Sequence, residues 1–328
     1  MAYNIAKRIL VAKREAVAGT KETLADADFD VRMRGSEFTP DIENNDEDSK
    51  FTTGDYGEDV SISGIQGATA TSMTKLSSGA SIGVAPKYNK LFEGCGLVEE
   101  VFAGVGVGYQ PLSSGDKQTI TLGKCDISDN GTPVGIQADM AGVMGNMTLS
   151  AEGVGSPLSV AYEWKGKFSS LTDLSNASIL ALTSPDTTIG SKMLNGTATI
   201  FGQSLCLQSF SMNLGNTIEY LPCPSESTGI KYSTIVNRQP RATLTFIAPA
   251  TSVLNPLSDV ILQTENSILL TFGDWSLVIP RAQILSYSES DYNGRLGYEL
   301  NLKLNRNSGA DANLADESTF QLLQGAIA

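Results

Sequence analysis

The chain has 328 residues and a formal net charge of −13, from 36 acidic and 23 basic residues. It contains no histidine, which excludes serine–histidine and cysteine–histidine catalytic pairs as well as histidine-containing zinc sites. The acidic balance disfavours nucleic-acid binding by the chain as a whole, and 32 glycines among many serines and threonines are typical of an all-β protein with frequent turns.

The first segments predict strands on either side of an acidic loop. Residues 5–16 fit a short amphipathic helix or an edge strand, while residues 31–34 and 37–40 alternate as strands do. Acidic residues then dominate as far as Asp59, which predicts a long exposed loop over residues 41–64. This loop does not fit an EF-hand, because Asp46 stands where that motif requires glycine and Thr52 where it requires glutamate.

The next segments predict one strand, a short helix and several further strands. Residues 70–74 form the first strand and residues 87–92 the helix, and further strands follow at residues 118–123, 147–150 and 160–164. Residues 104–108 are glycine-rich, but Pro111 follows them where a dinucleotide site would begin a helix, so we expect a bulged strand.

The same order of elements recurs near the C-terminus. A strand at residues 242–246 and a helix at 256–262 precede strands at 267–272, 276–279, 284–287 and 298–302. Asn293-Gly294 predicts a tight hairpin turn before the last strand. The length fits about two domains of ~100 to 200 residues, so we read the pattern as a duplication.

The predicted fold is all-β dominated with minor α: two tandem β-sandwich or barrel domains, each flanked by a short helix. Residues 1–175 form the first domain, residues 176–192 a polar linker, and residues 193–307 the second domain. The second domain carries a long polar loop over residues 215–239, in the place of the acidic loop. Residues 308–328 form a C-terminal arm, and we expect its apolar residues Phe320, Leu322 and Leu323 to dock on another surface, such as a neighbouring subunit.

The remaining signals point to structure, not chemistry. The cysteines at 95, 125, 206 and 223 lack a C-x-x-C spacing, which favours free and mostly buried thiols. Trp164 and Trp275 occupy strand positions and are expected in the core. We expect no cofactor and no metal. A signal-peptide core and a run of ~18 apolar residues are both missing, so cytoplasmic assembly without a membrane span is expected.

Several segments carry a resemblance to a known family. An apolar strand ends in Lys13-Arg14-Glu15-Ala16-Val17-Ala18-Gly19-Thr20, and a later one ends in Phe38-Thr39-Pro40. These segments resemble the opening of the tail tube proteins of tailed bacteriophages. The similarity continues through residues 87–95, 145–153 and 158–168, and it covers about residues 7–168.

The resemblance implies a structural virion protein that forms stacked rings, whose inner strands build one barrel around a lumen. DNA passes through this lumen without specific binding. The partners implied are other copies of the chain, a tape-measure protein in the lumen and tail-tip or terminator proteins at the ends. Assembly in the cytoplasm of the bacterial host would precede incorporation into the virion tail, and no enzymatic activity is implied.

Two ring stoichiometries remain open. Such rings usually hold six domains, so two tube-like domains per chain would make three chains per ring. If the second half is instead a surface decoration domain, the ring would hold six chains.

The resemblance also implies that the long acidic loop contacts the next ring, and the repeat extends this role to the second loop. The residues assigned to these contacts are Asp41, Glu43, Asp46, Glu47, Asp48, Lys50, Asp55, Tyr56, Glu58, Asp59, Glu219, Tyr220, Glu226, Lys231 and Tyr232.

Two other classes of function compete with this one. The chain could be another self-assembling phage protein, such as a tail-completion, sheath or decoration protein. An enzyme or sugar-binding sandwich would need paired carboxylates beside aromatic platforms, and the sequence shows no such pairing.

Overall fold

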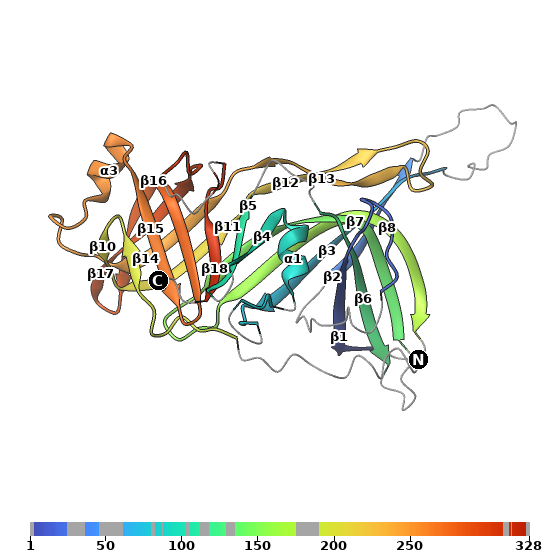
Figure 1. Cartoon of the computed structure of the whole chain (residues 1–328), viewed down its shortest axis with the longest axis horizontal. Helices are drawn as coiled ribbons and strands as arrows, with labels where there is room; N and C mark the ends of the chain where they lie inside the picture. Colours follow the sequence, from blue (N-terminus) through green and yellow to red (C-terminus); the bar gives the residue numbers. More distant parts are fainter. Residues whose placement is uncertain are drawn as a thin grey trace, which may run out of the picture.

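The computed structural model describes residues 3–24, 37–45, 62–79, 83–86, 88–102, 105–111, 118–128, 135–174, 190–310, 315 and 317–325. These residues form mostly antiparallel strands with two short helices, which confirms the all-β dominated fold (Figure 1). We call residues 3–174 the first half and residues 190–325 the second half. The predicted strand at 31–34 and most of the predicted linker at 176–192 lie outside the described residues.

The elements of the first half are β1 (Tyr3–Arg14), β2 (Glu37–Asn45), β3 (Ile62–Lys75), α1 (Asn89–Gly94), β4 (Leu97–Phe102), β5 (Gly106–Pro111), β6 (Ile120–Ser128), β7 (Gly135–Ala151) and β8 (Ser159–Leu174). The second half contains β9 (Ala198–Ile200), β10 (Gln203–Ser204), β11 (Leu207–Asn213), β12 (Asn216–Pro222), β13 (Ile230–Arg238), β14 (Arg241–Ile247), α3 (Pro256–Leu262), β15 (Glu265–Phe272), β16 (Trp275–Tyr292), β17 (Arg295–Leu304) and β18 (Gln321–Gly325).

Local signals explain several of these elements. The segment at residues 5–16, which fitted a helix or a strand, is the strand β1. Helix α3 has the predicted bounds, because Asn255 caps its N-terminus by accepting a hydrogen bond from the Ser258 amide and Pro256 occupies the first turn. Asn293 and Gly294 have positive φ angles of 51° and 77°, as a tight hairpin turn requires.

Six strands in each half lie in the same order. In the first half the order is β1-β6-β7-β8-β3-β2, and in the second half it is β9-β15-β16-β17-β14-β11. Numbered along the chain within each half, both series read first, fourth, fifth, sixth, third, second. The helix of each half also follows the third strand of the series, α1 after β3 and α3 after β14.

The two halves share one sheet and one core. Strand β11 of the second half pairs with β7 of the first, and β18 lies between β5 and β16. Trp164 and Trp275 are both buried in the core, as expected, and the ring of Trp275 stacks on Tyr109 from the other half at 6.4 Å. In Figure 1 the second half lies on the left, and β12 and β13 extend from it over the first half.

Candidate assembly surfaces

The predicted polar loop over residues 215–239 is a two-stranded hairpin. Strands β12 and β13 pair with each other from Asn216–Arg238 to Pro222–Ile230, apart from the main sheet. We call residues 216–238 the second-half arm. It lies against β7, β8 and β3 of the first half (Figure 1), so the segment predicted as a long polar loop is mostly strand.

The base of the arm is attached to backbone carbonyls just after α1 and on β7. The side-chain amide of Asn216 donates to the carbonyl oxygens of Cys95 at 2.8 Å and Gly145 at 2.9 Å. Arg238 donates to Asn216 Oδ1 at 2.8 Å and to the carbonyl oxygen of Gly96 at 3.1 Å. Burial lowers the pKa of the Arg238 guanidinium, because desolvation disfavours its charged form.

The middle of the arm passes close to two glycines of the first half. A Cβ atom at Gly19 would lie 2.1 Å from the carbonyl oxygen of Lys231, and one at Gly142 would lie 2.8 Å from the Cα atom of Tyr232. Both glycines also have positive φ angles, 80° and 61°. A side chain at either position would therefore displace the arm and strain the backbone.

A buried carboxylate holds both glycines in place. Glu15, which is only 3% exposed, accepts hydrogen bonds from the amides of Gly19 and Gly142, both at 2.7 Å. Its two oxygens also accept from the hydroxyls of Thr119 at 2.6 Å and Thr121 at 2.9 Å. Glu15 thus joins β1, β6 and β7 into the platform on which the arm lies.

The tip of the arm contacts two lysines on β8. Lys165 Nζ lies 4.2 Å from the ring centroid of Tyr220, and Lys167 Nζ lies 3.3 Å from a carboxylate oxygen of Glu226. These contacts show that the outer face of β8 binds an arm through a cation–π contact and an ion pair.

The predicted contact residues of the second loop all lie on this arm. Tyr220, Glu226, Lys231 and Tyr232 contact the first half of the same chain, a partner that the sequence did not indicate, while Glu219 is exposed. Sequence reasoning did not select Asn216, Arg238 or Glu15. A signal for Glu15 and Gly19 did exist, because both stand in the segment that carries the family resemblance.

The predicted contact residues of the first loop are placed less fully. Asp41 and Glu43 lie on β2. The others, Asp46, Glu47, Asp48, Lys50, Asp55, Tyr56, Glu58 and Asp59, fall outside the residues that the structure describes. Contact of either loop with a neighbouring ring stays a prediction.

The C-terminal arm docks on its own chain. Phe320 and Leu322 are buried and Leu323 is half-buried, and β18 pairs with β5 on one side and β16 on the other. These three residues therefore help to join the two halves.

The four cysteines differ in how far they are exposed. All four thiols are free, as expected, but only Cys95 and Cys125 are buried, whereas Cys206 is exposed and Cys223 half-buried. Within the described ranges, Cys, Asp and Glu side chains do not gather in groups of three or more that could hold a metal ion. In the same part of the chain, neither helix has the length and apolar character to cross a membrane.

Comparison with protein-family models and with curated proteins returns no match for this chain.

Proposed function

We propose that this chain is a structural virion protein that polymerises as stacked rings into the tail tube of a bacteriophage. The observation that carries the proposal is the repeated strand order in the two halves, together with the β11–β7 pairing that joins them side by side. The chain therefore contains two similar units and one lateral junction between them.

A ring needs that junction to be repeated from chain to chain. A head-to-tail contact between identical units generates a ring when the rotation closes, and closure also removes the unpaired edges of the sheets. Six units around the ring correspond to three chains, each of which supplies two.

The charge of the chain suits a conduit for DNA. A net charge of −13 repels a polyanion, so DNA in the lumen would pass without being held. On this proposal a tape-measure protein occupies the lumen during assembly, and tail-tip and terminator proteins bind the ends of the tube. The protein assembles in the bacterial host and ends in the virion.

The buried carboxylates support a structural role over catalysis. Glu15 accepts four hydrogen bonds from protein donors. Asp139 contacts Lys21 Nζ at 2.6 Å and accepts hydrogen bonds from Gln137 and Ser170. Both groups are occupied in holding strands together, so neither supplies a free general acid or base.

Electron microscopy of the purified protein, with rotational averaging of end-on views and a mass measurement per ring, tests the proposal. We expect hollow tubes with three chains in each pseudo-six-fold ring. Six chains per ring would still support a tube protein, but the second half would then be a surface decoration domain and not a ring-forming unit. Discrete particles without a lumen would contradict the proposal and favour a tail-completion, sheath or decoration protein.

A further inference from the structure

We infer that β2 of one chain pairs with the open edge of β16 in a second copy, as β11 pairs with β7 within the chain. This inference rests on the proposed function, since it names the surfaces through which the chain assembles with itself.

Strand β7 shows what a completed junction looks like. One of its edges pairs with β8, and its other edge pairs with β6 as far as Val143 and then with β11 over Thr148–Ala151. The amide of Leu214 donates to the carbonyl oxygen of Met147 at 3.0 Å and extends the contact. Residues 144–151 of β7 are consequently all buried or half-buried.

Strand β16 holds the same place in the second half, but part of its edge is open. Strand β15 pairs with β16 up to Gln283, and β17 covers the opposite edge from Ala282 to Tyr292. From Ile284 onward the edge that β15 leaves has no strand partner in the described part of the chain. Six of residues 285–292 are exposed, in contrast to the buried end of β7.

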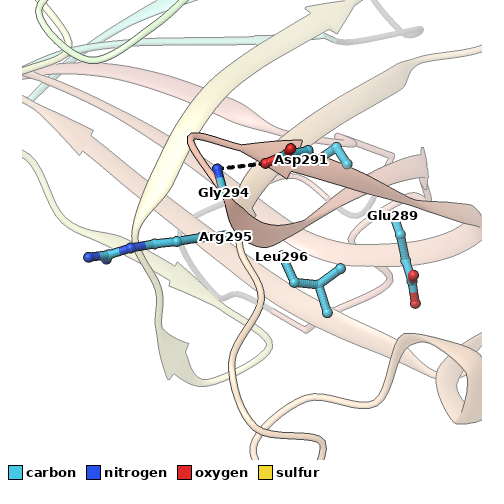
Figure 2. A pocket seen from close by; sticks show the side chains of 6 residues that line it. Glu289, Asp291, Gly294, Arg295 and Leu296 are labelled. Atoms are coloured by element: carbon cyan, nitrogen blue, oxygen red, sulfur yellow. Dashed lines mark hydrogen bonds between the residues drawn. The ribbon is translucent and has the colours of Figure 1, made fainter.

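Figure 2 shows the end of this open segment. The β16–β17 hairpin forms a shallow hollow, and Asp291 Oδ1 accepts a hydrogen bond from the Gly294 amide at 2.7 Å, which holds the turn. The side chains of Glu289, Arg295 and Leu296 point apart from one another. The turn is therefore held by a contact within the hairpin, and the side chains of Glu289, Arg295 and Leu296 remain exposed.

Strand β2 is the complementary open edge. It holds the place of β11 in the first half, but it pairs with β3 alone among the described strands, whereas β11 pairs with both β14 and β7. Strand β2 ends the sheet at the first half, and β16 lies within the second half, on the far side of the β11–β7 junction (Figure 1). Their pairing is therefore a head-to-tail contact between two chains.

Helix α3 carries an exposed apolar patch beside β16. Helix α3 lies against β16 and exposes Leu257 by 52%, Ile261 by 70% and Leu262 by 67%. Leu285 on β16 and Leu296 on β17 are also exposed. Soluble monomers rarely expose large apolar patches, and such a patch usually marks an interaction surface.

Cysteine cross-linking of the full-length chain tests this interface. In a background with Cys206→Ser and Cys223→Ser, one batch carries Thr39→Cys on β2, and other batches carry Ser286→Cys, Ser288→Cys or Ser290→Cys on β16. A disulfide requires Cα atoms about 4.4 to 6.8 Å apart, so the correct register should cross-link and others should not. Thr39→Cys mixed with Ser204→Cys, on the distant strand β10, is the control.

We expect mixed batches to give a reducible dimer for at least one β16 position and none for the control. Tubes without any β2–β16 cross-link would overturn the interface while leaving the proposed function intact. Cross-linked chains that assemble into particles without a lumen would support the β2–β16 interface and contradict the proposed function as a tube protein. A protein that stays monomeric and gives no cross-link at high concentration would refute both.

Discussion

Replacing the buried carboxylate of Glu15 should loosen the second-half arm. Each oxygen of Glu15 accepts one glycine amide and one threonine hydroxyl, and these four donors come from three separate segments. In Glu15→Gln the amide oxygen can replace one carboxylate oxygen, but the NH2 group faces the other pair of donors. The threonine hydroxyl there can turn and accept, whereas the glycine amide cannot.

The expected cost follows from this count. One buried glycine amide loses its acceptor, which costs about 1 to 3 kcal/mol, and the remaining bonds lose their charge assistance. We therefore expect Glu15→Gln to lower the free energy of unfolding by about 3 kcal/mol. The amides of Gly19 and Gly142 form the platform under Lys231 and Tyr232, so the arm should also lose contact with the first half.

Denaturant unfolding and hydrogen exchange together measure both effects. We expect a lower unfolding midpoint and faster exchange at the β13 amides, while β17 amides stay protected until global unfolding. Glu163→Gln, at an exposed position on β8, is the matched control and should behave as the wild type. A Glu15→Gln variant with the stability and arm protection of the control would refute the role assigned to Glu15.

Three further predictions concern the core, the apolar patch and the thiols. Leu302 is fully buried, so Leu302→Asp should unfold the second half at a cost of several kcal/mol, measured by circular dichroism; a folded variant would contradict the burial of β17. Ile261→Ser should leave the melting temperature unchanged but reduce tube formation in electron micrographs. The control Leu171→Ser, at a position 64% exposed, should assemble normally, and equal assembly by both variants would exclude the apolar patch as an assembly surface. A hydrogen bond with Ser225 lowers the pKa of the Cys223 thiol, while burial raises the pKa of the Cys95 thiol. Iodoacetamide near neutral pH should therefore modify Cys223 before Cys95, and the reverse order in peptide mapping would contradict this.

Local patterns in the sequence determined the class of fold and many of its elements. Tyr298, Leu300 and Leu302 alternate with polar residues in the strand predicted at residues 298–302, which lies within β17, and all three side chains are buried. Asn293-Gly294 predicted the hairpin turn, and the apolar pattern with its flanking residues predicted α3 at its bounds. These features were predictable because strand periodicity, turn conformation and helix capping depend on residues close together in the chain.

The candidate site was only partly predictable. The sequence marked Tyr220, Glu226 and Tyr232 as residues of a projecting segment, but it gave no sign that the segment is a hairpin across β7 and β8. It also marked the apolar C-terminal residues as docking groups without indicating that their partners are β5 and β16. In each case the residue type indicated that a contact forms, and the identity of the partner was missing.

The tertiary structure decided which distant segments meet. Glu15 binds the amide of Gly142, Arg238 binds the carbonyl of Gly96, and β11 completes the edge of β7, all across long stretches of chain. The open edge of β16 likewise becomes visible only when its neighbours are known. Sequence periodicity records which face of a strand is buried, but strand pairing uses backbone groups that every residue carries, so partners are fixed by the packing of the whole sheet.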